Sequence, residues 1–556
     1  MEMDYRVEGI TYKYSKEGRT VLDNVSFSIE QGKVTAIVGP SGCGKSTLLE
    51  ILSGVIPTLI SNGELSGTFQ KPEDSLISVV SQTPENQLFG YGVEDAIAFG
   101  LENMGVPQAE IAQRMDYVLD LLSLQYLRAR SVANLSGGQR QAVCIASVLA
   151  MQPDILIMDE PVSSLDPNGK SLVQMVLKQI SLDGNTVILV DNNLVWSAGI
   201  VDHIIGMLDG KVVFDGSKEE FFQDFDLQQR LGVIIPQEVE IYRGLLPYFP
   251  DLKMFYTVED GLNQLAMMMD TKLFSKVKVP DEETGESIIS VHNLEKVFGD
   301  NFHALMDVNA NIPEGKIIAV LGQNGSGKTT FVKHLNGLYK PTAGDVRYKG
   351  QSLLDKSVAQ ISHNIILVFQ HPEHMLFEET VEAELTFCAR MQGIPFTKEK
   401  INEVLAKYNM LEDKDTFPLN LSMGKKHTLT ILSVLFSNAD VIILDEPTLG
   451  MDGFLMKELE TLIKMLKEEG KTVIIISHEI PMVFRTVDDA IILNNGKKIF
   501  QGTREQLATR DDIFDSIHIS MPPAVVMSKA LGFDRICYNV EEFVEEAKAL
   551  KVKEAE

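Results

Sequence analysis

Short, predominantly apolar runs alternate with longer stretches of mixed polar and apolar positions in both halves of the chain. Val34–Val38, Ile155–Met158, Ile317–Leu321 and Val441–Leu444 are such runs, each of strand length. They are typical of strands buried on both faces of a parallel sheet, and helices fit the stretches between them. The pattern predicts α/β domains with mainly parallel sheets. No run approaches the roughly 18–20 apolar residues of a membrane-spanning helix.

The second half of the chain repeats the first. Asp445 follows Asp159 by 286 positions, and Pro522 follows Pro236 by the same interval. A repeat of this length indicates duplicated domains rather than a solenoid, whose units run about 20–50 residues. The polar, acidic segment Val279–Ser287 contains Pro and Gly and is typical of a linker. We expect a first domain over 1–225, a helical extension over 226–278, a linker over 279–287, a second domain over 288–510 and a C-terminal extension over 511–556.

A glycine-rich loop follows an apolar run in each half. Gly39–Ser46 and Gly322–Thr329 both match G-x-x-x-x-G-K-[ST]. Between a strand and a helix, such glycines let backbone N–H groups point at phosphate oxygens, the lysine adds positive charge, and the hydroxyl reaches Mg²⁺. The sequence therefore predicts two sites for a nucleoside triphosphate. The residues expected to contact it are Gly39, Ser41, Gly42, Gly44, Lys45, Ser46 and Thr47 in the first copy and Gly322, Asn324, Gly325, Gly327, Lys328, Thr329 and Thr330 in the second.

Two acids end an apolar run in each half: Asp159-Glu160 and Asp445-Glu446. A buried strand delivers both carboxylates to the sheet edge beside the phosphate loop. We expect Asp159 and Asp445 to bind Mg²⁺ together with Ser46 and Thr329 of the list above. Glu160 and Glu446 are the candidate general bases that polarise the attacking water.

The segment Leu135-Ser136-Gly137-Gly138-Gln139 precedes an Ala-rich apolar stretch and the Asp-Glu strand. With this motif in place, the chain resembles the ABC ATPases over nearly its whole length. The resemblance implies two P-loop, RecA-like α/β domains, each with a helical subdomain, an antiparallel β subdomain and a small C-terminal helical extension. In that family Ser136, Gly137, Gly138 and Gln139 would cover ATP bound to the other domain, and Ser422 and Gly424 hold the matching positions in the second copy.

Further positions are assigned by the same resemblance. Gln82 and Gln370 occupy the glutamine position that contacts Mg²⁺ and water, and His478 occupies that of a histidine that contacts the γ-phosphate. Tyr14 and Phe298 occupy the position of an aromatic ring that stacks on adenine. Ordinary strand aromatics are an equally good interpretation of these two rings, because aromatic residues are enriched in strands.

The two copies differ at positions that matter for chemistry. Asn192 stands in the first copy where His478 stands in the second, and Met423 and Lys425 replace a glycine and the glutamine of the Ser136–Gln139 motif. If the domains pair head to tail, as the family implies, both departures fall in one composite site. We therefore expect the site of Lys328, Glu446 and His478 to be the main hydrolytic one.

The amino-acid composition and net charge limit the classes of partner that are expected. The formal net charge is −28 and the pI about 4.8, and no Lys/Arg cluster stands out, so nucleic acid is not expected as a partner. The four cysteines form no C-x-x-C pair and predict neither a disulfide framework nor a zinc site.

The segments after the two glutamines point to a subgroup. Gln82–Phe89 and Val93–Gly100 resemble the ATPases of energy-coupling factor (ECF) and cobalt-type importers, and Gln370–Phe377 keeps most of the pattern. The resemblance implies a peripheral ATPase on the cytoplasmic face of a prokaryotic membrane. Its partners would be an integral membrane coupling protein and a substrate-binding membrane subunit. The cargo would be a vitamin, a vitamin precursor or a metal ion, without direct contact with this chain.

Two alternatives stay open. A tandem sugar-importer ATPase would share the duplicated domains, although the ECF-like segment argues against it. A soluble ABC protein that acts in translation would usually carry a basic helical linker or an iron–sulfur domain, and the sequence shows neither.

Overall fold

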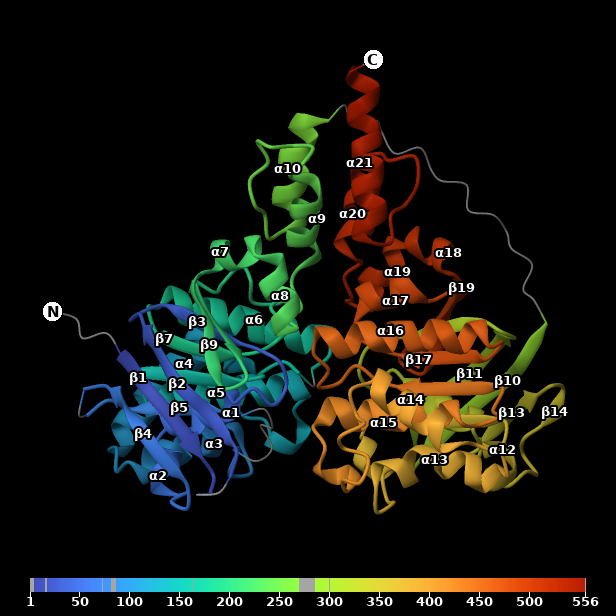
Figure 1. The fold of residues 1–556 in the computed structure, drawn as a ribbon, viewed down its shortest axis with the longest axis horizontal. Coiled ribbons are helices and arrows are strands. Elements are labelled where there is room, and N and C mark those ends of the chain that lie inside the picture. Colours follow the sequence, from blue (N-terminus) through green and yellow to red (C-terminus); the bar gives the residue numbers. More distant parts are fainter. Residues whose placement is uncertain are drawn as a thin grey trace. The chain divides into compact units, whose positions relative to one another are not determined.

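The computed structural model describes residues 5–15, 18–72, 74–81, 87–163, 165–269, 286–299 and 301–555. They form two compact units, Met1–Arg243 with Met254–Thr257, and Gly244–Lys253 with Val258–Glu556. Most of the expected linker, residues 279–285, lies outside the described residues, as does Gln82. The first unit therefore holds the first phosphate loop, and the second unit holds the other (Figure 1).

A six-stranded sheet forms the centre of the first unit, in the order β5-β6-β7-β3-β8-β9. Its strands pair in parallel except for β9, which runs antiparallel to β8. The strands of this unit are β1 (Tyr5–Lys13), β2 (Thr20–Ile29), β3 (Val34–Val38), β4 (Glu64–Gln70), β5 (Ile77–Val80), β6 (Ile155–Asp159), β7 (Thr186–Val190), β8 (His203–Leu208) and β9 (Lys211–Ser217).

The second unit repeats this sheet in the order β15-β16-β17-β12-β18-β19. The matching order means that the phosphate loop follows the same strand in both units. The strands here are β10 (Ser287–Phe298), β11 (Phe302–Pro313), β12 (Ile317–Leu321), β13 (Ala343–Tyr348), β14 (Gln351–Ser352), β15 (Ile365–Val368), β16 (Val441–Asp445), β17 (Thr472–Ile476), β18 (Asp489–Asn494) and β19 (Lys497–Thr503).

The central strands are predominantly apolar because both faces of the sheet are covered. Along β6, Leu156 and Met158 belong to a core shared with helices, whereas Ile155 and Ile157 belong to a core shared with a second, antiparallel sheet. That alternation is the period of a strand. The runs found in the sequence are therefore strands with two buried faces.

An antiparallel sheet supplies one of these covers in each unit. Its strand order is β2-β1-β4 in the first unit and β11-β10-β13-β14 in the second. Together with the mainly parallel sheets, these strands confirm the predicted fold of two α/β domains with antiparallel β subdomains.

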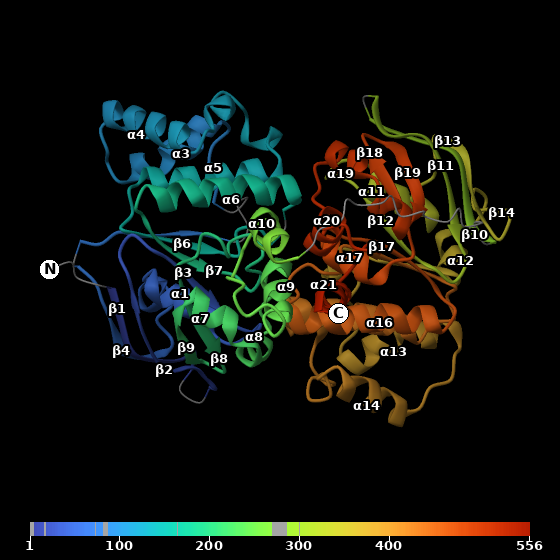
Figure 2. The ribbon, with the colours of Figure 1, turned by 90° about the horizontal axis from the view of Figure 1, so that it is seen from above.

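Helices supply the other cover. In the first unit α3, α4 and α5 pack on one another, and Figure 2 shows them on the side of the sheet away from β1, β2 and β4. In the second unit α13 packs on α14 and α15. The α-helices that precede the last two strands of each six-stranded sheet are α1 (Lys45–Leu52), α2 (Val55–Thr58), α3 (Val93–Asn103), α4 (Gln108–Leu121), α5 (Gly137–Ala150), α6 (Pro167–Leu182), α11 (Lys328–Leu335), α12 (Val358–Ser362), α13 (Val381–Gln392), α14 (Lys398–Lys407), α15 (Met423–Leu435), α16 (Gly453–Glu468) and α17 (Ile480–Thr486).

Further helices follow the last strand of each copy. They are α7 (Lys218–Gln223), α8 (Phe225–Leu231), α9 (Gln237–Leu245), α10 (Val258–Met268), α18 (Arg504–Ala508), α19 (Asp511–Ser516), α20 (Pro523–Ala530) and α21 (Val540–Ala555). The division between the two units falls inside α9, and α10 packs against α20 within the second unit. The end of the first copy's extension is therefore part of the core of the second unit.

No helix in the described part of the chain combines the length and the apolar character needed to cross a membrane.

A substitution at Gly244, near the end of α9, can test how closely the helical extensions pack. A Cβ atom there would lie 2.5 Å from Cγ2 of Val544 in α21, and Lys548 lies over the ring of Tyr248 at 5.2 Å. Alanine favours a helix over glycine by about 1 kcal/mol. We nevertheless expect Gly244→Ala to destabilise the second unit by about 1–3 kcal/mol, because the contact overpacks a closed interface.

Thermal unfolding followed by calorimetry measures this effect. Gly199→Ala is the matched control, since no described atom lies within 4 Å of a Cβ built there. Adding Val544→Ala to Gly244→Ala should recover part of the loss. A Gly244→Ala chain that unfolds at or above the wild-type temperature would contradict this packing.

Candidate nucleotide sites

The phosphate loop of the second unit is shaped by its glycines. Gly322 has a φ of 147°, and a Cβ there would lie 2.2 Å from the carbonyl oxygen of Leu493. Only glycine fits such a place. Nζ of Lys328 donates to the carbonyl oxygens of Gly322 and Gln323 at 2.8 and 2.9 Å. The ammonium group is thereby held across the loop, where it would meet the phosphates of a nucleotide.

The first unit builds the same loop from different neighbours. Gly39 has a φ of 154°, with the carbonyl oxygen of Met207 2.2 Å from a Cβ position. Lys45 donates to the carbonyl oxygens of Gly39 and Pro40. Cys43 is buried in the loop, and desolvation raises the pKa of its thiol. Both loops therefore have the backbone form that a triphosphate requires.

The carboxylates expected to bind Mg²⁺ lie at the ends of β6 and β16. In the second unit the hydroxyl of Thr329 donates to Oδ1 of Asp445 at 3.4 Å, so the two expected oxygen ligands are adjacent. Burial raises the pKa of both Asp159 and Asp445. A hydroxyl and one carboxylate fit Mg²⁺, which takes few protein ligands when phosphates and water complete its shell.

Glu446 and His478 face each other in the second unit. His478 Nε2 lies 3.0 Å from Oε1 of Glu446 and 3.2 Å from Oδ1 of Asn324 in the phosphate loop. Both side chains are 15% exposed. Burial is the main cause that raises the pKa of Glu446 to about 7; Lys328 opposes the shift and Asp445 adds to it. This arrangement joins the candidate general base, a histidine and the phosphate loop.

The first unit replaces this arrangement. Oδ1 of Asn192 accepts a hydrogen bond from the backbone N–H of Gly39 at 2.9 Å, so the side chain is fastened to the phosphate loop. Asp191, which is buried, accepts hydrogen bonds from Nε1 of Trp196 and from the N–H of Asn193, both at 2.8 Å. Burial first, and then the charges of Asp191 and Asp159, raises the pKa of Glu160 to about 7. The base of this site thus has a buried acid beside it in place of a histidine.

Asp191 and Trp196 were not predicted from the sequence as residues of this site. Their counterparts 286 positions on are Ser477 and Met482, so a comparison of the two copies marks both as departures. Trp196 is also the single tryptophan of the chain.

The Ser136–Gln139 segment begins α5. The Ser136 side chain accepts from the N–H of Gln139 at 3.3 Å, and the Gln139 side chain accepts from the N–H of Ser136 at 3.1 Å, which is a capping box. A Cβ on Gly138 would lie 2.4 Å from the Cα of Gly169 in α6. The second glycine is therefore required by helix packing as well as by any contact with a nucleotide.

The matching segment of the second copy is built differently. Ser422 still caps α15, but the ammonium group of Lys425 cannot accept a hydrogen bond and so cannot complete a capping box; its Nζ pairs with Asp413 at 2.6 Å instead. A Cβ on Gly424 would lie 2.2 Å from Cδ1 of Leu455. Met423 is 37% exposed, and its side chain lies beside Gly450. The segment keeps its serine and one glycine but presents a methionine side chain beside them.

The remaining predicted residues are two aromatic rings and one glutamine. Tyr14 is 46% exposed, and its hydroxyl is 3.0 Å from Oγ1 of Thr47. Phe298 is half-buried and meets the ring of Tyr339 edge to face at 5.4 Å. Gln370 is half-buried just after β15. Tyr14 thus contacts the residue that follows the first phosphate loop, whereas Phe298 contacts Tyr339, and adenine stacking stays a prediction for both rings.

Comparison with known proteins agrees with this geometry. A family model described as ABC transporter matches residues 22–163 and 305–449. An ABC transporter ATP-binding protein of Caldanaerobacter subterraneus subsp. tengcongensis is 33% identical over 97% of this chain and 98% of its own length. A Bacillus subtilis protein whose name assigns it to HMP/thiamine import is 30% identical over 91% of this chain and 92% of its own.

Solved structures are similar over the same extent. One named RNase-L Inhibitor covers 92% of this chain and 93% of its own, with a TM-score of 0.59 and 20% identity, which supports the fold alone. The family model and the full-length relatives settle the family. The chain belongs to the ABC transporter family, as an ATP-binding protein that carries two ATPase domains.

Proposed function

We propose that this ATPase drives a membrane importer, of the ECF type, for a vitamin, a vitamin precursor or a metal ion. The observation that carries the proposal is the full-length similarity, through both halves, to an ATP-binding protein named for HMP/thiamine import. The chain would work at the cytoplasmic face of the membrane with an integral coupling protein and a substrate-binding subunit.

Exposed aromatic pairs support a protein partner. Phe89 and Phe99 stack at 4.7 Å and are 52% and 43% exposed. In the second unit Phe377 is 60% exposed and meets Phe387 edge to face at 4.7 Å. Phe89 and Phe377 end the segments that begin at the two glutamines, and exposed apolar groups of this kind mark interaction surfaces. We assign them to contact with the membrane partner.

The proposed mechanism uses the second unit as the main hydrolytic centre. Lys328 holds the β- and γ-phosphates, and Thr329 and Asp445 would hold Mg²⁺, which would supply positive charge beside the phosphates. Glu446 accepts the proton of the attacking water, and His478, within reach of Glu446 and Asn324, orients the γ-phosphate. The Ser136–Gln139 segment would close this site if the domains pair head to tail, as we propose.

The other composite site would bind ATP and turn it over slowly. Asn192 cannot carry positive charge, and its oxygen is already fastened to Gly39. Met423 adds a side chain where the first copy has the glycine Gly137. These departures affect catalysis more than nucleotide binding, since Lys45 and its loop are intact.

Substitution of the two candidate general bases distinguishes the contributions of the two sites to ATPase activity. We expect Glu446→Gln to lower steady-state ATPase activity by about 100-fold or more, because the general base of the main site is lost. Glu160→Gln should lower it by less than about threefold. Fluorescent ATP should bind both variants as it binds the wild type, which is the control. Equal residual activities would contradict the proposed asymmetry.

The pH profile tests the role of Glu446. It must be ionised to accept a proton, and burial raises its pKa to about 7. Its ionised fraction therefore falls from about one half at pH 7 to about one tenth at pH 6. We expect kcat at saturating MgATP to rise between about pH 6 and pH 8, with binding of fluorescent ATP at pH 6 as the control. A flat profile over this range would contradict the assignment.

The membrane partner can be tested through the aromatic pairs. The affinity-tagged chain, expressed in its native host, should co-purify with an integral membrane protein only when detergent is present. Phe89→Asp combined with Phe377→Asp should abolish that co-purification and leave basal ATPase activity unchanged. Ile499→Asp, at a side chain that is 41% exposed on β19, is the matched control.

A role in translation is the second candidate, because archaeal ribosome recycling factor shares the fold at 20% identity and a TM-score of 0.58. Salt-sensitive co-sedimentation with ribosomes, without any membrane partner, would favour it and would refute the importer proposal.

A further inference from the structure

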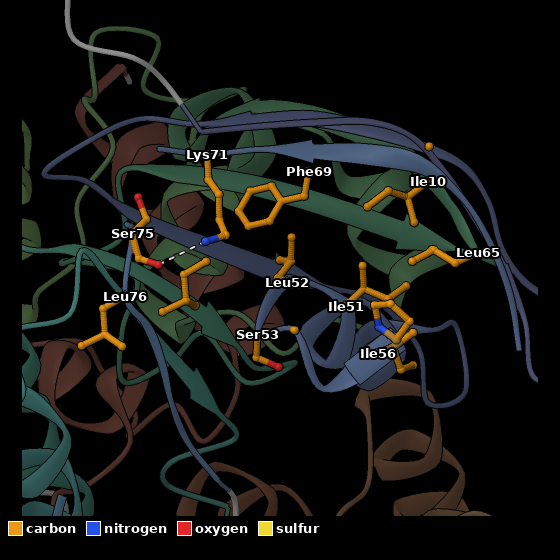
Figure 3. A pocket seen from close by; sticks show the side chains of 14 residues that line it. Ile10, Ile51, Leu52, Ser53, Ile56, Leu65, Phe69, Lys71, Ser75 and Leu76 are labelled. Atoms are coloured by element: carbon orange, nitrogen blue, oxygen red, sulfur yellow. Dashed lines mark hydrogen bonds between the residues drawn. The ribbon is translucent and has the colours of Figure 1, made fainter. Parts of the chain in front are cut away.

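An apolar pocket of about 430 Å³ opens on the first unit, between its antiparallel sheet and the C-terminal end of α1 (Figure 3). Aliphatic and aromatic side chains from five elements line it, Ile10 of β1 among them. They include Ile51 and Leu52 of α1, Ile56 of α2, Leu65 and Phe69 of β4, and Ile77 of β5. The pocket is separate from the phosphate loop and plays no part in the mechanism above.

The second unit covers the matching surface with its own chain. Residues 71–76 join β4 to β5 in the first unit, whereas residues 349–364 join β13 to β15 in the second. The longer connection contains β14 and the short helix α12. Leu353 and Ile361 of this connection are 4% and 2% exposed. The second copy thus shows what an occupied pocket looks like.

Two glycines at equivalent positions show where the two units differ at this surface. Gly54 and Gly337 follow α1 and α11 at the same distance from their phosphate loops, with φ of 79° and 75°. A Cβ on Gly337 would lie 2.3 Å from Cδ1 of Ile361. At Gly54, none of the described atoms lies within 4 Å of that position. The first unit has an opening where Ile361 packs in the second.

The walls of the opening are less buried than their counterparts. Ile365 is 1% exposed and Val346 is 3% exposed in the second unit. Their counterparts in the first unit, Ile77 and Phe69, are only half-buried. Apolar surface that the α12 connection removes from water in one copy is therefore left accessible in the other, a favourable place for further burial.

We propose that this pocket is a docking site for a short amphipathic helix of a partner protein that presents Leu or Ile side chains. The α12 connection is the template for the occupant, since a surface of the same ancestry accepts Leu353 and Ile361. Lys71 lies at the rim, where its ammonium donates to the carbonyl oxygen of Ser75 at 3.2 Å. The positive charge of Lys71 favours an acidic residue on the polar face of the partner's helix. The inference does not depend on the nature of any cargo.

A peptide with the sequence of residues 349–364, labelled with a fluorophore, tests the site on the full chain. Its binding should saturate, and a peptide with Leu353→Asp and Ile361→Asp should bind at least about tenfold more weakly. Leu65→Lys in the chain should weaken binding similarly. Val213→Lys, at a side chain 39% exposed compared with 37% for Leu65, should have no effect. Equal binding of the two peptides, or equal effects of the two chain variants, would overturn the proposal.

A chimeric chain that carries the longer connection in the first unit tests the docking site if the free peptide binds too weakly to measure. A chain in which residues 349–364 replace residues 71–76 should unfold at a higher temperature, keep its ATPase activity and lose any peptide binding. A graft that leaves the unfolding temperature unchanged or lower would overturn the proposal. Displacement of the peptide by decanoate at equal concentration would assign the pocket to a lipid chain and would also overturn it.

Discussion

The burial of an acidic pair beside the lysine of the phosphate loop is the constraint on which both nucleotide sites depend. Apolar strands covered on both faces bring Asp445 and Glu446 to a sheet edge with little water. Ionised carboxylates are costly there unless a cation is near. Lys328, held by the phosphate loop, favours the ionised form of Glu446 but only partly opposes the effect of burial. The glutamate is thus left close to the pKa that suits a general base at neutral pH.

The same scaffold gives two different sites because a few neighbours of this pair differ. In the second unit a histidine joins the base to the phosphate loop. In the first, Asn192 is fastened to Gly39, and Asp191 is held by the indole of Trp196. A second buried acid near Glu160 disfavours its ionised form further. The contacts of Lys45 with the carbonyl oxygens of Gly39 and Pro40 remain in place, and this is why we propose that the first site binds ATP but hydrolyses it slowly.

Much of the fold could be predicted from the sequence. The strands have two buried faces, so their apolar runs are continuous, and the phosphate loops have local motifs that do not depend on distant residues. The family and the ATPase activity follow from the same motifs. The roles of Tyr14, Phe298, Gln82 and Gln370 stay predictions, and Gln82 lies outside the described residues.

Other features could not be read locally because they depend on residues far apart in the chain. The packing of Gly138 on Gly169, the pairing of Lys425 with Asp413 and the contact of Gly244 with Val544 each join separate elements. Asp191 accepts a hydrogen bond from the indole of Trp196, a contact that no local motif indicates. The open pocket of the first unit is visible only by comparison with α12 in the second, since a short connection alone does not show which apolar surface it leaves exposed.

The central claim is that one site hydrolyses ATP while the other retains it. The most direct measurement is a rapid-quench experiment in which the full chain is loaded with radiolabelled MgATP, separated from free nucleotide and analysed after one turnover. The account predicts about equal amounts of ADP and unhydrolysed ATP on the protein. Complete conversion of the bound ATP to ADP in a single phase would contradict it.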